Sequence, residues 1–116
     1  MPVSPGFIQF VVEQLEGCGP ITTRRLFGGV GIYSDDVFFA IVADDVLYLK
    51  VGDVNRKDFE RAKCKAFRPY GDKRESMTYY NVPVAVLEDS DELTKWGKKA
   101  IAAAIAAKHG KRKPRL

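Results

Sequence analysis

The sequence predicts an α+β fold with two layers, in which a five-stranded antiparallel sheet carries helices packed on one face. Apolar residues recur at helical spacing near both ends of the chain. Between them, residues 27–51 alternate in the manner of strands, and two acidic pairs interrupt the alternation. A second strand-like region lies at 67–82. The expected order is helix, short helix, three strands, helix, two strands and helix (α-α-β-β-β-α-β-β-α).

The first helix is expected to begin at Ser4-Pro5, because a hydroxyl residue followed by proline is a typical helix start. Gly17 and Gly19-Pro20 should end it. The segment 22–25, Thr-Thr-Arg-Arg, is interpreted as a short second helix or a turn.

Three strands are expected next, at 27–33, 37–42 and 46–51. Asp35-Asp36 and Asp44-Asp45 separate them, and two-residue breaks of this kind are typical of tight hairpin turns. The three strands should therefore form an antiparallel meander.

The second half of the chain continues with a short surface helix that ends near Cys64 and is capped by Asp53 or Asn55. Strands are expected at 67–70 and 77–82, with Pro69 favouring an edge position. The last helix should be capped by Asp89 or Ser90 and end at Gly110. Its apolar face comprises Leu93, Trp96, Ala100, Ile101, Ala104 and Ile105.

The 116 residues fit one domain, and the hydrophobic fraction of 46% is that of an ordinary globular protein. No window approaches 18 uninterrupted apolar residues, and the first residues lack the pattern of a secretory signal. We therefore expect a soluble cytoplasmic protein without membrane association. Cys18 and Cys64 have no CxxC partner, which favours two free thiols over a metal site or a redox pair.

The net charge of +4 is unevenly distributed. Residues 108–116 carry five basic side chains and no acidic one, so we expect residues 1–107 to form the domain and 108–116 a disordered basic tail. A second basic stretch, 56–74, holds eight basic and three acidic residues.

The sequence offers no convincing catalytic, metal or cofactor site. His109 is the one histidine and stands at the boundary of the last helix and the tail, without a positioned partner. The acidic pairs fit turns better than cation sites. We therefore expect no catalytic residue, no metal and no cofactor, and hence a protein that is not an enzyme.

The glycine-rich segment Gly28-Gly29-Val30-Gly31 lacks the pattern of a phosphate loop and leads into a strand. A positive φ, a bulge or the close approach of another backbone explains it better. Arg24 and Arg25 precede it directly and are candidate contacts for an anion, a small ligand or a partner.

Two features leave nucleic-acid binding open. The tail residues Lys108, Lys111, Arg112, Lys113 and Arg115 would attract phosphates without regard to sequence. The aromatics Phe67, Tyr70, Tyr79 and Tyr80 lie near the 56–74 stretch, and such an arrangement can bind single strands. Positions in the core and rim of the sheet are the favoured interpretation of these rings.

Taken in order, several segments resemble the N-terminal domain of the TfoX/Sxy family across about residues 5–107. The similarity is carried by the combination of Arg25-Leu26-Phe27-Gly28-Gly29 with Gly31 and Tyr33, Leu47-Tyr48-Leu49-Lys50, Ser76-Met77 with Tyr79-Tyr80, and Leu93 to Trp96. The resemblance implies a two-layer α+β fold, no known enzymatic activity, and a link to competence for DNA uptake in bacteria. Full-length members act as transcriptional coactivators and carry a further helical domain. In this sequence the basic residues 108–116 stand where that domain would follow, so we expect a stand-alone N-terminal domain.

Two functional hypotheses follow. The first is a non-enzymatic interaction module that acts in or near transcription regulation through a protein partner. The alternative is non-specific nucleic-acid binding through the tail and the 56–74 stretch. Neither the partner nor the oligomeric state can be predicted from the sequence.

Overall fold

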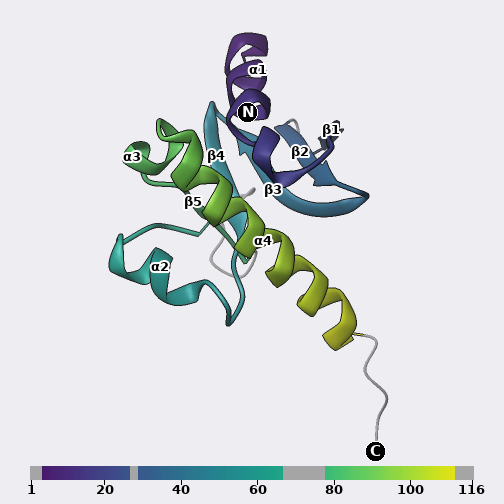
Figure 1. Ribbon diagram of the computed structural model, residues 1–116, viewed down its shortest axis with the longest axis vertical. Helices are drawn as coiled ribbons and strands as arrows, with labels where there is room; N and C mark the ends of the chain where they lie inside the picture. The colour runs from purple at the N-terminus through teal and green to yellow at the C-terminus, as the bar shows by residue number, and fades with distance from the viewer. Residues whose placement is uncertain (1–3, 27–28, 67–77, 112–116) are drawn as a thin grey trace, which may run out of the picture.

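The computed structural model describes residues 4–26, 29–66 and 78–111 (Figure 1). Its elements in chain order are α1 (Pro5–Gln14), the 3-10 turn η1 (Glu16–Cys18), β1 (Ile21–Leu26), β2 (Gly29–Ser34), β3 (Val37–Ala43), β4 (Val46–Lys50), α2 (Arg56–Arg61), β5 (Tyr79–Asn81), α3 (Val84–Leu87) and α4 (Ser90–Lys111). The strands form one five-stranded sheet in the order β1-β2-β3-β4-β5, and every neighbouring pair is antiparallel. The predicted α+β class is confirmed.

The main core lies between the sheet and the helices. Helix α4 crosses the sheet and packs on β3 and β4 (Figure 1). Val11 and Leu15 from the first helical region and Leu93 from α4 are fully buried against Phe39 and Leu49 of the sheet. A second, smaller cluster contains Ile41, Ala43 and Tyr79, with Phe38 and Tyr48 packed against it. Because neighbouring side chains of a strand point to opposite faces, this second cluster marks the helix-free face of the sheet.

Both acidic pairs form the predicted hairpin turns. Asp35 and Asp36 have φ values of 49° and 67°, and Asp44 and Asp45 have values of 53° and 55°. Two successive positive φ values define the turn type that suits the twist of a two-residue hairpin, and aspartate tolerates this conformation. The interpretation of the pairs as turns is therefore confirmed.

The interpretation of Thr22–Arg25 as a short helix or turn is wrong, because these residues form the body of strand β1. Each pairs across the ladder with β2, from Ile21 opposite Ser34 to Leu26 opposite Gly29. Threonine is well suited to a strand, and the paired backbone decides the conformation where the side-chain pattern is ambiguous. The strand predicted at 67–70 lies outside the described residues.

The ends of the outer helices differ in part from the prediction. Ser4 does stand at the start of α1, but its side chain makes no cap bond to the helix. Its hydroxyl donates to Asp45 Oδ2 at 2.6 Å, and its backbone N–H donates to Asp45 Oδ1 at 2.7 Å. Asp89 caps α4 as predicted, because its Oδ1 accepts from the N–H groups of Asp91 and Glu92. The predicted end of α4 at Gly110 is wrong, since the helix continues to Lys111 and thus includes the first residues of the expected tail.

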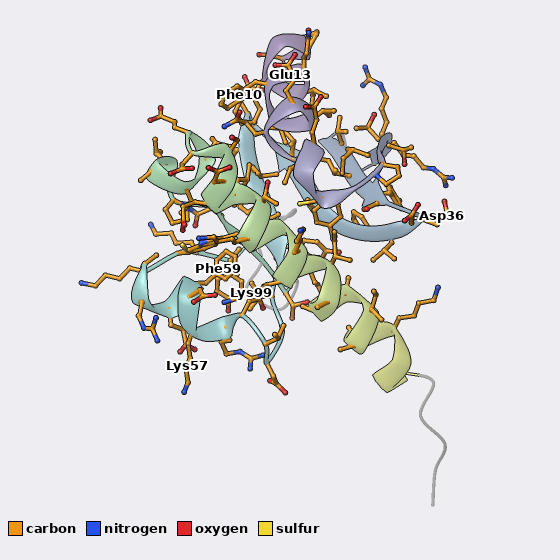
Figure 2. The ribbon with its side chains drawn as sticks, in the orientation of Figure 1. Phe10, Glu13, Asp36, Lys57, Phe59 and Lys99 are labelled. Atoms are coloured by element: carbon orange, nitrogen blue, oxygen red, sulfur yellow. The ribbon has the colours of Figure 1, made fainter. Side chains whose placement is uncertain are left out.

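Helix α2 is the predicted short surface helix, anchored by one ring. Phe59 is 1% exposed and points toward α4, whereas Lys57 points away from the body of the protein (Figure 2). Asn55 precedes the helix and is buried, and it fixes the preceding loop by accepting from the N–H of Gly52 and donating to the carbonyl of Lys50. Helix α3 was not predicted.

Candidate interaction surface

The helix-free face of the sheet carries a row of aromatic rings with a cation at each end. The rings of Tyr33 and Phe38 stack with centroids 5.0 Å apart, and the ring of Tyr79 follows 5.4 Å from Phe38. The guanidinium of Arg24 lies 5.3 Å from the centroid of Tyr33, and the ammonium of Lys50 lies 5.3 Å from the centroid of Tyr79. The row therefore crosses the sheet from β1 to β5 through side-chain contacts.

These rings are packing groups. Tyr79 is only 5% exposed, and Tyr33 and Phe38 are half-buried and stack on each other. Burial and the nearby Tyr33 raise the pKa of Tyr79 far above its ordinary value of 10.0. A base-stacking platform needs exposed ring faces, which this arrangement does not offer at Tyr79.

Several residues of the family pattern lie on the helix-free face. Gly31 of β2 is paired with Arg24 on one side and with Ile41 on the other, and Tyr33, Lys50 and Tyr79 belong to the aromatic row. Leu49, Tyr80, Leu93 and Trp96 belong to the main core, where Leu49 is fully buried and the ring of Phe59 contacts those of Tyr80 and Trp96. Arg25 is exposed on the edge strand β1. Phe27, Gly28, Ser76 and Met77 lie outside the described residues.

Gly29 has a specific steric reason to be glycine. A Cβ at this position would lie 2.5 Å from the backbone oxygen of Val42. The predicted close approach of another backbone is therefore confirmed for this residue. A β-bulge is also present, between Ile32 and Tyr33 in the pairing of β2 with β3.

Arg24 and Arg25 occupy adjacent positions of the edge strand β1, and both are exposed. Their side chains point to opposite faces of the sheet because they are neighbours in a strand. Thr22 and Thr23, which precede them, are exposed as well. Neither arginine forms an ion pair with a described residue. The strand thus presents two cations and two hydroxyls at one edge of the sheet.

The described part of the 56–74 stretch forms a second cationic surface around α2. Lys57, Arg61, Lys63 and Lys65 are all exposed. Two other charges of this region are paired: Arg56 with Asp53 at 2.6 Å, and Asp58 with Lys99 of α4 at 3.0 Å. The charge of this stretch is evident in the sequence, but the pair between Asp58 and Lys99 joins residues 41 positions apart and has no local signal.

A shallow groove of about 580 Å³ lies between the loop at 52–54 and the C-terminal half of α4. Its apolar lining includes Val54 and Ala103, and its charged lining residues are Lys50, Asp53 and Arg56. Gly52 brings the loop close to α4, since a Cβ there would lie 3.1 Å from the Cβ of Ala103.

The described residues contain no cluster of three or more metal-binding side chains, and none of their helices is long and apolar enough to cross a membrane. Cys18 and Cys64 are free thiols, and burial raises the pKa of each. The thiol of Cys18 donates to the carbonyl of Thr94 at 3.6 Å. The side chain of His109 and those of the tail residues Lys111, Arg112, Lys113 and Arg115 lie outside the described part, whereas Lys108 is exposed on α4.

Comparison with known proteins links this architecture to one family. The family model described as the TfoX N-terminal domain matches residues 13–104, which include all five strands and most of α4. A relative from Aliivibrio fischeri (strain ATCC 700601 / ES114), described as DNA transformation protein TfoX1, is 36% identical over 50 residues. That match covers 43% of this chain and 24% of the relative, so the similarity spans a minor part of the relative's length.

Proposed function

Since the chain belongs to the TfoX N-terminal domain family, we propose that it is a non-enzymatic interaction module in the bacterial cytoplasm that regulates DNA transformation by binding a protein partner. The matching relative is described as a DNA transformation protein, which supports the assignment to this process. The observation that carries the proposed mode of action is the exposed edge strand β1, with Arg24 and Arg25 side by side on a firmly packed sheet.

This strand has the properties of a recognition surface. Its backbone is held by the complete ladder to β2, and Arg24 is positioned by the ring of Tyr33. A rigid support lowers the entropy that is lost when the exposed side chains bind a partner. Exposed arginines are also enriched at protein interfaces, where they contribute strongly to affinity.

The experiment is a deletion of the gene in the bacterium that encodes the chain, followed by complementation. Deletion should lower the frequency of natural transformation, and the wild-type chain should restore it. The R24E/R25E variant should fail to restore it while accumulating to the same level. The matched control is K57E/R61E, which makes the same change in charge at α2 and should complement. An unchanged transformation frequency after deletion would overturn the proposed role.

The alternative function, nucleic-acid binding, is favoured by one specific observation: four exposed cations cluster around α2, at Lys57, Arg61, Lys63 and Lys65. Such a surface, together with the basic tail, would bind phosphates with an affinity that falls steeply with salt. Replacing Lys111, Arg112, Lys113 and Arg115 by glutamine keeps the length of the chain and removes most of the tail's charge. Under this alternative, the variant should lose affinity for a single-stranded oligonucleotide, and K57E/R61E should weaken the affinity further.

Capture from the native cell separates the two functions. A tagged wild-type chain should retain its protein partner after nuclease treatment if it is a protein-interaction module. Loss of all captured material after nuclease would favour the alternative.

A further inference from the structure

The two edges of the sheet differ in how they end. Beyond β5, the backbone of residues 65–66 closes the edge, because Ala66 forms a bridge with Tyr80 and the carbonyl of Lys65 accepts from the N–H of Asn81. The side chain of Asn81 adds a bond by accepting from the N–H of Lys65 at 2.6 Å. Beyond β1, by contrast, no described residue pairs with the strand. One edge is thus capped by the chain itself, whereas the other is left open by every residue that the structure describes.

Strand β1 is also regular enough to serve as a template. Its six residues pair with β2 in an unbroken register, and the bulge of the sheet lies one strand further in, between β2 and β3. The strand contains no proline. Proteins usually protect an open edge by a proline, a bulge or a charge, and β1 has only the charge of its arginines.

The arginines indicate what the edge would accept. Arg24 and Arg25 point to opposite faces and form no ion pair with a described acid, so an added strand would meet one cation on each face. Acidic residues directly opposite would form favourable cross-strand pairs. A second copy of β1 would instead bring two arginines of each chain close together, and like charges opposite each other are destabilising.

We propose that β1 binds an extended acidic segment of the partner protein, which adds to the sheet as a further strand and places carboxylates against Arg24 and Arg25. The inference rests on the proposed function for the existence of a protein partner. Backbone hydrogen bonds to the open edge would supply affinity, and the two arginines would supply selectivity for acidic segments. The exposed hydroxyls of Thr22 and Thr23 can serve as additional cross-strand hydrogen-bonding groups.

The probe for the test is a fluorescein-labelled peptide with the central sequence Thr-Val-Glu-Glu-Val-Thr, titrated with the full chain in an anisotropy assay. Three comparison peptides accompany it: one with glutamine for glutamate, one with lysine for glutamate, and one with N-methylated amides at alternate residues. N-methylation leaves the carboxylates in place but removes backbone donors, so it separates strand addition from simple charge attraction.

The glutamate peptide should bind the wild type, and the glutamine and N-methylated peptides should bind about tenfold more weakly or worse, which corresponds to ~1.4 kcal/mol or more. R24E/R25E should lose the glutamate peptide and gain the lysine peptide, which also demonstrates that the variant is folded. K57E/R61E should keep the glutamate peptide with an affinity close to that of the wild type.

Four results would overturn the inference. Equal losses in R24E/R25E and K57E/R61E would mean that the peptide responds to net charge alone. Full binding of the N-methylated peptide would exclude strand addition. Absence of binding to the wild type, or dimers of the chain that R24E/R25E abolishes, would mean that the edge is protected by its arginines or occupied by a second copy. None of these results depends on the transformation assay. A failure of this inference can therefore be distinguished from a failure of the proposed function.

Discussion

Arg24 lies with its guanidinium carbon 5.3 Å from the ring centroid of Tyr33, which attaches the edge strand β1 to the aromatic row of the helix-free face. The same ring stacks on Phe38, so one tyrosine side chain connects an exposed cation with the buried side chains of the sheet. The position of the cation at the edge thus depends on packing further inside.

Replacing Tyr33 should test this connection. Tyr33→Leu removes the cation–π contact and the ring stack, each worth about 0.5–1.5 kcal/mol, and should lower the free energy of unfolding by about 1–2 kcal/mol. Tyr33→Phe keeps the ring and should change stability by less than about 0.5 kcal/mol. Urea denaturation of both variants measures the difference. Equal stability of the leucine variant and the wild type would show that the row contributes nothing.

Gly29 should tolerate no side chain. Gly29→Ala would place a Cβ 2.5 Å from the backbone oxygen of Val42, and we expect a loss of stability of about 1–3 kcal/mol because backbone must move. The matched control is Gly6→Ala in α1, where no atom lies within 4 Å of the added Cβ. That change should be neutral or stabilise by up to about 1 kcal/mol, because alanine favours a helix. Equal melting temperatures for the two variants would contradict the account.

Lys63 lies two residues beyond the end of helix α2, in a backbone conformation that favours glycine. Its φ is 57°, and the two C-terminal bonds, from the N–H of Cys64 to the carbonyl of Phe59 and from the N–H of Lys63 to that of Glu60, form the Schellman pattern. Lys63→Gly should therefore stabilise the protein by about 1 kcal/mol. Lys63→Ala removes the same charge but keeps the strained conformation, so a stabilisation shared by both variants would point to charge instead.

The contact between Ser4 and Asp45 predicts a pH dependence. The two hydrogen bonds from Ser4 lower the pKa of Asp45 below its ordinary value of 3.8. The folded protein therefore binds the Asp45 proton less tightly than the unfolded chain does. The stabilisation by the hydrogen bonds from Ser4 to the Asp45 carboxylate is present above pH 3.8, and it is lost as the pH falls through the lowered pKa of Asp45 in the folded protein.

Chemical denaturation from pH 2.5 to 6 compares the wild type with Asp45→Asn. The stability of the wild type relative to this variant should rise with pH and then level off above the ordinary carboxyl value. Ser4→Ala removes the hydroxyl donor but keeps the backbone donor, so it should show a weaker rise. A difference that is independent of pH would contradict the predicted direction.

The hairpin turns and the start of helix α4 were predictable because their signals are local. Asp35-Asp36 and Asp44-Asp45 stand where two-residue turns are needed, and Asp89 stands before a helical pattern. The strand character of Thr22–Arg25 was not predictable in this way. Four polar residues carry no apolar period, and their extended conformation comes from the ladder to β2, which is a tertiary contact.

The candidate surface was predictable only in its composition. The sequence singled out Arg24 and Arg25 as candidate contact residues, but it linked them to the glycine segment and could not place them on an edge strand. The ring that lies beside Arg24 belongs to Tyr33 of the next strand, across a hairpin. Such contacts depend on the strand register, which the pairing of the whole sheet determines.

The central claim is that the open edge of β1 receives a strand. Amide-resolved hydrogen exchange of the full chain, alone and with the glutamate peptide in excess, tests it most directly. Amides of Thr22–Arg25 that are not bonded to β2 should exchange fast in the free protein and be slowed by about tenfold or more in the complex. Protection confined to α2 or to the groove beside α4, with β1 unchanged, would contradict it.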